Sequence, residues 1–256
     1  MKQNNYSQSG IKQVSNHRYF VKIYSPEISL EKISDEFNKS KQLHDLANRS
    51  RLFLFPRPIS FENNNISFEL VEDFIELRCF LFKNNNLFWR DKNKISKLMT
   101  ELGTILGEIH TNLKLSEFEK LDDLINERTK TFLYGDFGLS NILIKKNGQI
   151  VLIDPSFNCV NKKVNVFGSI YWDLAYFYFS LKYLMPLKYY LLYDFGKIEY
   201  FFKIFKEAYE KKTNTIIQDD ILDKYLISIK NKYLNQLNKK SFNGLLWFLI
   251  LKWRLS

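Results

Sequence analysis

Asn147 and Gly148 lie between two short apolar runs in the segment TFLYGDFGLSNILIKKNGQIVLIDPS, which spans residues 131–156. An Asn-Gly pair in this setting is the strongest short-range signal for a β-hairpin with a two-residue type I′ turn. Such a turn fixes the strand register and sets Asn141 opposite Asp154, with Cβ atoms about 5 Å apart. The segment therefore predicts a hairpin whose open end carries an amide and a carboxylate on one face.

Oxygen ligands of this kind suit Mg²⁺, which takes few protein ligands and completes its shell with water and substrate phosphates. Asn141 and Asp154 are therefore candidate metal ligands. Asp136 lies in the loop that enters the first strand, five positions before Asn141. A surface hairpin with ordinary polar ends is the alternative interpretation of the hairpin taken alone.

The chain before residue 76 has the pattern of a small sheet with one helix. Alternating β-branched and aromatic residues predict a strand over 20–24, paired with 11–14 across a short turn. Apolar residues at helical spacing predict a helix over 30–46. Two further strands are expected over 57–61 and 66–71, separated by three asparagines that favour a turn.

After residue 77 the chain changes to helical patterns. Eight apolar residues at helical spacing predict a helix over 95–113. The hairpin follows, and the final hundred residues have the pattern of aromatic-rich helices. The sequence thus predicts an α+β protein of two lobes, a β-rich N-terminal lobe over 1–75 and a larger helical lobe over 76–256.

The formal net charge is +10, with 38 Lys and Arg against 28 Asp and Glu. A basic surface can bind nucleic acid, an anionic membrane or a phosphorylated ligand. The lysines are scattered rather than gathered in one tract, which argues against nucleic acid as a partner.

Two cysteines are too few for a disulfide framework or a structural zinc site, and the polar N-terminus lacks the apolar core of a signal peptide. We therefore expect a cytoplasmic protein. The C-terminal GLLWFLILKWRLS is expected to form a buried last helix, with contact to a membrane or a partner as the alternative interpretation.

The pattern Asp136-x-x-x-x-Asn141 followed by Ile153-Asp154-Pro155 resembles the catalytic and metal motifs of the protein-kinase-like superfamily. The residues of this motif are most similar to those of the branch of aminoglycoside phosphotransferases and choline/fructosamine kinases. In that branch the catalytic loop reads His-Gly-Asp-x-x-x-x-Asn, whereas this chain has Tyr134 at the position of the histidine.

Further segments resemble this family in the same order along the chain. Residues 102–110 (LGTILGEIH) are similar to the helix that ends in a histidine, and residues 168–175 (GSIYWDLA) to the element whose Asp173 braces the catalytic loop. Residues 19–23 (YFVKI) are similar to the strand that carries the phosphate-binding lysine, and residues 68–74 (FELVEDF) to the adenine-binding hinge.

The resemblance implies a bilobal kinase-like fold, with ATP or another nucleoside triphosphate and Mg²⁺ as cofactors. It implies Asp136 as the catalytic base and Asn141 and Asp154 as metal ligands. The implied nucleotide-binding residues are Lys22, Glu36, Glu72 and Phe74. The phosphate-covering loop of the family is expected to be short here and to contain a single glycine, since only Ser7–Gly10 is available for it.

Two helix carboxylates compete as the partner of Lys22. Glu31 and Glu36 are five residues apart and so point about 140° apart around a helix. Glu36 lies at the edge of the apolar stripe defined by Ile33 and Phe37, whereas Glu31 lies closer to the solvent side. We therefore predict a Lys22–Glu36 pair.

The acceptor is expected to be a hydroxyl of a small molecule bound on the helical lobe. The basic lobe favours a neutral or anionic acceptor over a polycation, which leaves sugar, glycan or amino-alcohol chemistry open. Core packing is the favoured explanation for the tyrosines after Asp173, and a helix N-terminus is the favoured explanation for Asp219, Asp220 and Asp223. A non-catalytic nucleotide-binding scaffold, an atypical protein kinase and an RNA-associated ATPase are also compatible with the sequence.

Overall fold

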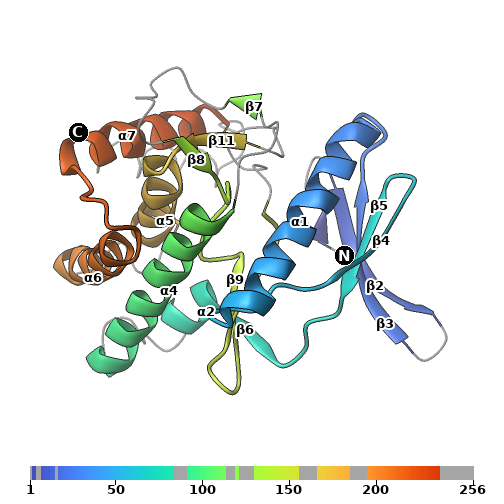
Figure 1. The fold of residues 1–256 in the computed structure, drawn as a ribbon, viewed down its shortest axis with the longest axis horizontal. Helices are drawn as coiled ribbons and strands as arrows, with labels where there is room; N and C mark the ends of the chain where they lie inside the picture. The colour runs from blue at the N-terminus through green and yellow to red at the C-terminus, as the bar shows by residue number, and fades with distance from the viewer. Residues whose placement is uncertain are drawn as a thin grey trace, which may run out of the picture.

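The computed structural model describes residues 2–3, 7–14, 17–82, 91–113, 119–120, 130–155, 166–184 and 195–236. Within these ranges the protein is α+β, with a β-sheet at the N-terminal side and a mostly helical C-terminal part (Figure 1). No helix in the described ranges is both long and apolar enough to cross a membrane. The C-terminal segment GLLWFLILKWRLS lies outside the described residues.

The N-terminal sheet has five antiparallel strands in the order β1-β2-β3-β5-β4. The strands are β1 (Lys2–Gln3), β2 (Ser7–Val14), β3 (His17–Tyr24), β4 (Pro58–Glu62) and β5 (Asn65–Glu69). The predicted strands are all present. Ser7–Gly10, expected as a phosphate-covering loop, instead forms the first half of β2, and Ser9 is paired with Lys22 on β3. The expectation of a loop was wrong because the β2–β3 ladder is longer than its apolar pattern indicates.

Helix α1 (Leu30–Ser50) stands between this sheet and the helical part of the molecule (Figure 1). It begins at the N-cap Ser29, whose hydroxyl accepts from the main-chain N–H of Lys32. Its first half packs Ile33 and Phe37 into a small core beneath the sheet. Its second half packs Leu43 and Leu46 into the large core. One helix therefore belongs to both hydrophobic cores.

Residues 70–73 lead from β5 to β6 (Phe74–Glu76), which pairs with the predicted hairpin. That hairpin consists of β9 (Ile142–Lys145) and β10 (Ile150–Leu152), so the sheet order is β10-β9-β6. The segment that follows α1 also pairs with this hairpin, because the main-chain N–H of Leu54 donates to Ile150 O and its carbonyl accepts from Leu152 N. The hairpin is thus held from both sides by segments that come from the small lobe.

The hairpin register differs from the prediction by one residue. Ile144 faces Ile150, and the main-chain N–H of Ile153 donates to Asn141 O at 3.0 Å. A type I′ turn needs positive φ at both central residues, but only Gly148 has it, at 88°. Gly148 N donates to Lys145 O, which closes a longer loop with glycine in the left-handed position. Asn141 therefore lies opposite Ile153, and the expected pairing with Asp154 was wrong.

The helical part contains α2 (Leu77–Phe82), α4 (Lys92–Asn112), α5 (Tyr171–Tyr183), α6 (Phe195–Thr213) and α7 (Asp219–Gln236). A small sheet of β7 (Glu119–Lys120), β11 (Val166–Ser169) and β8 (Lys130–Phe132) completes it. Helices α4 and α6 pack closely, since a Cβ at Gly103 would collide with the main chain of Phe205. Asp219 and Asp220 lie in the first turn of α7, as the favoured explanation for the acidic cluster required.

Candidate active site

Lys22 connects the small sheet, α1 and the hairpin. It extends from β3, and its Nζ donates to Glu36 Oε1 on α1 and to Asp154 Oδ1 after β10, both at 2.7 Å. Lys22 and Glu36 are almost fully buried, whereas the side chain of Asp154 is 33% exposed. The predicted Lys22–Glu36 pair is present, and the rival Glu31 is exposed to solvent. The three charged groups bring together segments that are more than a hundred residues apart in sequence.

The charge of Lys22 is stabilised by its surroundings. Burial alone would lower the pKa of Lys22, but the facing carboxylates of Asp154 and Glu36 outweigh burial and hold that pKa well above its usual value. Nζ also lies 5.1 Å from the ring centroid of Tyr24 on the same face of β3. Lys22 is therefore a fixed cation at the point where the two lobes meet.

Asp136 lies in the loop between β8 and β9 and is buried. Burial raises the pKa of its carboxyl to about 7, and the negative charge of Asp154 acts in the same direction. Hydrogen bonds from Tyr176 and Asn141 oppose this rise. A carboxyl with a pKa near neutrality can take up a proton at physiological pH, which suits a general base.

Asn141 and Asp154 lie at the open end of the hairpin. The amide nitrogen of Asn141 donates to the main-chain carbonyl of Asp136 at 3.1 Å, which leaves the amide oxygen as the atom able to bind a cation. Asp154 has a φ of 53°, a left-handed conformation that is uncommon for residues other than glycine and is concentrated at functional sites. One amide oxygen and one partly exposed carboxylate fit Mg²⁺ that is also bound by substrate phosphates.

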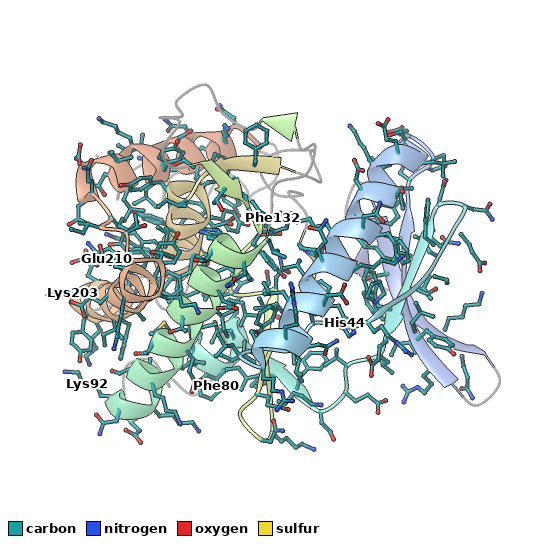
Figure 2. The ribbon with its side chains drawn as sticks, viewed as in Figure 1. His44, Phe80, Lys92, Phe132, Lys203 and Glu210 are labelled. Carbon is teal, nitrogen blue, oxygen red and sulfur yellow. The ribbon has the colours of Figure 1, made fainter. Side chains whose placement is uncertain are left out.

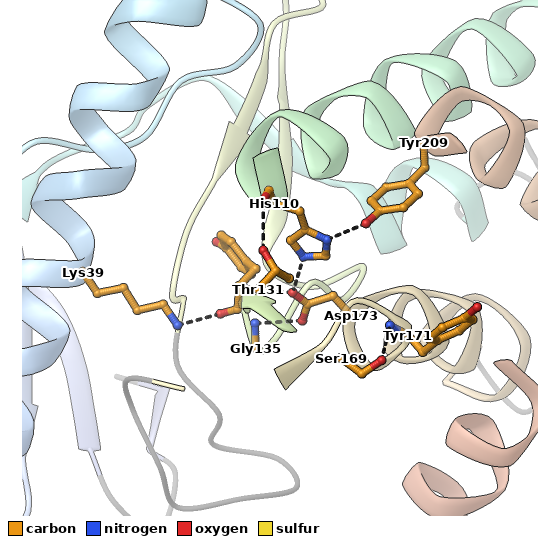
Figure 3. A network of polar contacts seen from close by, with 9 residues as sticks. Lys39, His110, Thr131, Gly135, Ser169, Tyr171, Asp173 and Tyr209 are labelled. Atoms are coloured by element: carbon orange, nitrogen blue, oxygen red, sulfur yellow. Dashed lines mark hydrogen bonds and ion pairs between the residues drawn. The ribbon is translucent and has the colours of Figure 1, made fainter. Parts of the chain in front are cut away.

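Asp173 braces the loop that carries Asp136 (Figure 3). It lies fully buried in the first turn of α5, and its two oxygens accept from the main-chain N–H groups of Tyr134 at 2.6 Å and Gly135 at 2.9 Å. His110, at the end of α4, places Nε2 3.0 Å from Asp173 and Nδ1 2.8 Å from the hydroxyl of Tyr209. These bonds extend the contacts predicted for Asp173 into a buried network that includes α6.

Two members of this region were not identified from the sequence as functional residues. Tyr134 donates its hydroxyl to the main-chain carbonyl of Ile153 at 2.6 Å. Lys39, on α1, donates to the main-chain carbonyl of Tyr134 at 2.9 Å (Figure 3). The only signal for Lys39 in the sequence is its spacing of three residues from Glu36.

The two residues predicted at the hinge lie on the surface. Glu72 is in the link between β5 and β6 and forms an exposed ion pair with Arg18 at 2.7 Å. Phe74 begins β6 opposite Lys145, and 45% of its surface is exposed. In the part of the chain that the structure describes, neither side chain has a hydrogen bond or an ion pair with Lys22, Glu36 or Asp154. Their part in nucleotide binding therefore stays a prediction.

Most of the described tyrosines shortly after Asp173 are part of the core, in agreement with the favoured explanation. Tyr176 and Tyr183 are buried, and Tyr178 stacks on Phe202 at 4.1 Å between ring centroids. Tyr200 is 41% exposed, with the ammonium of Lys92 over its ring. Tyr189, Tyr190 and Tyr193 lie outside the described residues.

This combination of a small sheet, a bridging helix and a braced loop before a hairpin defines the protein-kinase-like fold. Comparison with solved structures places the chain in the form of that fold shared by choline kinases and antibiotic phosphotransferases. No protein-family model matches the sequence, and no curated protein matches it by sequence.

Three solved structures illustrate the similarity. The choline kinase LicA from Streptococcus pneumoniae has a TM-score of 0.56 and 15% identity, covering 97% of this chain and 89% of that one. The spectinomycin phosphotransferase APH(9)-Ia, in complex with ADP and spectinomycin, has a TM-score of 0.60 and 12% identity over 99% and 87% of the two chains. The macrolide 2′-phosphotransferase MphH from Brachybacterium faecium has a TM-score of 0.57 and 11% identity over 97% and 89%.

Proposed function

We propose that the protein is a phosphotransferase that moves the γ-phosphoryl group of ATP to a hydroxyl of a small molecule. The observation that carries this proposal is the ion-paired Lys22, held at 2.7 Å by Glu36 from the small lobe and by Asp154 from the hairpin. Phosphoryl transfer depends on positioning and charge neutralisation rather than covalent catalysis. A fixed cation between two lobes, next to a buried carboxyl, suits that requirement.

In the proposed reaction Asp136 accepts the proton of the acceptor hydroxyl as its oxygen attacks the γ-phosphorus. The bond from phosphorus to the bridging oxygen breaks, and ADP leaves with the electron pair. Asp136 is suited to this step because its pKa is about 7, so that it exchanges a proton near neutral pH. Asp173 holds the main chain just before Asp136 and so fixes where the carboxyl stands.

Lys22 would bind the α- and β-phosphates, with Glu36 keeping its ammonium in place. Asn141 and Asp154 would hold Mg²⁺, which supplies neutralisation of phosphate charge when bound. Residues 70–73 would bind adenine through main-chain groups, with Glu72 and Phe74 at its edge. The proposal places the enzyme in the cytoplasm, where ATP and Mg²⁺ are available.

Sugars, glycans and amino alcohols are the proposed acceptor classes. The similar structures are described as enzymes for choline, spectinomycin and a macrolide, which are all small hydroxyl compounds. A net charge of +10 disfavours a polycationic aminoglycoside, because an acceptor of the same sign is repelled. The acceptor class is therefore to be found by a screen of neutral, anionic and singly cationic alcohols.

Transfer from radiolabelled ATP to a panel of such alcohols, with and without Mg²⁺, tests the proposal. We expect Mg²⁺-dependent labelling of one class and its loss in Asp136→Asn. If the protein binds nucleotide but neither labels an alcohol nor hydrolyses ATP, it is a non-catalytic scaffold. Labelling of added protein would identify an atypical protein kinase, and ATP hydrolysis stimulated by RNA would identify an RNA-associated ATPase.

A further inference from the structure

Helix α1 carries two buried charged residues at the boundary between the two hydrophobic cores. Glu36 and Lys39 are three residues apart and therefore project from nearly the same face of the helix. On their N-terminal side Ile33 packs in the small core, and on their C-terminal side Leu43 packs in the large core. The two charges thus occupy the place where α1 passes from one lobe to the other.

Lys39 points into the helical lobe, whereas Glu36 is bound to Lys22 of the sheet. The Nζ of Lys39 donates to the main-chain carbonyl of Tyr134 at 2.9 Å and lies 5.0 Å from the ring centroid of Phe132. Figure 2 labels Phe132 on the side of the helical lobe that faces α1. Lys39 is 1% exposed, so this contact is made away from solvent. A side chain of α1 therefore touches the loop two residues before Asp136.

A buried lysine is costly unless its charge is compensated. Four carboxylates, Asp173, Glu36, Asp154 and Asp136, act on Lys39 and favour its charged form. Burial has the larger effect and lowers the pKa of Lys39 to about 8, which still leaves it charged at neutral pH. Packing alone would be satisfied by leucine or methionine, so the ammonium at this position needs another explanation.

We propose that Lys39 is a positioning residue that couples the placement of α1, and with it the Lys22–Glu36 pair, to the loop that carries Asp136. The Tyr134 carbonyl that accepts from Lys39 belongs to the residue whose N–H donates to Asp173. Lys39 and Asp173 therefore hold the same residue from opposite lobes (Figure 3). The kinetic consequences rest on the proposed function, whereas the coupling itself does not.

The structural test is hydrogen exchange of the full chain with Lys39→Met and, as a matched control, Lys32→Met. Lys32 lies on the exposed side of the same helix, and its substitution removes the same charge. In Lys39→Met we expect exchange to quicken by about tenfold both in peptides covering 30–50 and in peptides covering 131–139. Lys32→Met should match the wild type in both. Unchanged exchange, or faster exchange in 30–50 alone, overturns the coupling.

The kinetic test follows ATP hydrolysis with Mg·ATP, which needs no knowledge of the acceptor. We expect Lys39→Met to lower kcat by about tenfold while the KM for Mg·ATP changes by less than about threefold. An equal loss in Lys32→Met, or an unchanged kcat in Lys39→Met, contradicts the proposal. If the wild type neither hydrolyses ATP nor labels any alcohol of the panel, the proposed function fails while the exchange experiment still decides on Lys39.

Lys39→Arg gives a second variant that keeps a cation and hydrogen-bond donors at this position. We expect its exchange in 131–139 to stay within about threefold of the wild type. If Lys39→Met does not fold, this variant carries the test. Loss of protection in 131–139 in folded Lys39→Arg, with 30–50 unchanged, would show that a cation at this position does not hold the loop, and would contradict the proposal.

Discussion

The hydroxyl of Tyr134 donates to the main-chain carbonyl of Ile153 at 2.6 Å. This bond joins the residue two positions before Asp136 to the residue immediately before Asp154. The proposed base and the proposed metal ligand are thus held at a fixed separation by a side chain that takes no part in the chemistry. It also gives a physical reason why this chain has tyrosine where the catalytic motif that it resembles has histidine.

Tyr134→Phe should therefore weaken both activity and stability. The carbonyl of Ile153 would be left without this donor, at a cost of about 1–3 kcal/mol in the free energy of unfolding. We expect kcat to fall about tenfold through loss of positioning. Urea unfolding and steady-state kinetics measure both effects. Tyr200→Phe removes an exposed hydroxyl and serves as the control. Full activity in Tyr134→Phe would show that the bond is dispensable.

Asp136→Asn should abolish transfer while leaving nucleotide affinity nearly intact. Removal of a general base lowers kcat by about 10²–10⁴-fold. Calorimetry with Mg·ATP should give a Kd within about threefold of the wild type, since Asp136 is not among the residues proposed to bind the nucleotide or the metal. A variant that keeps more than about a third of wild-type kcat would exclude Asp136 as the base.

The pKa of Asp136 also makes stability depend on pH. Its carboxyl has a pKa of about 7 in the folded protein and close to 3.8 in the unfolded chain. Between these values the folded state binds more protons, so this group makes the protein less stable as pH rises through the window. Asp136→Asn removes that dependence. Its free energy of unfolding relative to the wild type should therefore increase from about pH 4 to about pH 7 and then level off.

Urea titrations at several pH values measure this difference, and a pH-independent difference would contradict a raised pKa. Activity should depend on the same ionisation of Asp136, but it should rise with pH where the contribution of this group to stability falls. The proposed base works only when ionised, so transfer should increase with pH up to the pKa of Asp136.

Asp154→Ala should remove the Mg²⁺ dependence of nucleotide binding. The carboxylate is partly exposed and follows a strand, so its loss is expected to leave the fold in place. Isothermal calorimetry in Mg²⁺ and in EDTA separates the metal from the nucleotide contribution. Equal ATP affinity of the wild type under both conditions would rule out the metal site.

Glu36→Gln and Glu31→Gln form a matched pair on one helix. Glu36 is buried and bound to Lys22, whereas Glu31 is exposed. We expect Glu36→Gln to lower kcat/KM for Mg·ATP by about tenfold or more, because Lys22 then keeps the carboxylate of Asp154 but loses that of Glu36. Glu31→Gln should change stability by no more than about 0.5 kcal/mol and leave the kinetics unchanged. Similar kinetic effects in the two variants would contradict the assignment.

Helix periodicity was enough to predict the partner of Lys22, because the apolar stripe of α1 fixes which carboxylate turns inward. The hairpin was also predictable, but its register was not. Asn147-Gly148 is compatible with a two-residue turn and with a longer loop that ends on a left-handed glycine, and the two differ by one residue. The sequence contains no signal that separates them.

The burial of Lys39 could not be predicted from its neighbours in sequence. Lysines are almost never fully buried, so a lysine on a helix is expected in solvent. Its burial depends on where the helical lobe lies against α1, which is a property of tertiary structure. The hydroxyl of Tyr134 was missed for a similar reason, since its acceptor is a main-chain carbonyl 19 residues further along the chain.

The division of α1 between two cores has a consequence for modularity. Among the described residues, the core beneath the sheet contains Tyr24, Ile33, Ile66 and Phe68 as its buried members, and one of these four comes from α1. A core of this size does not sustain an independent unit. The second half of the same helix needs the other lobe to cover Leu43 and Leu46. The N-terminal lobe is therefore not a transferable building block: recombination at the link between β5 and β6 would separate a helix from half of the surface that folds it.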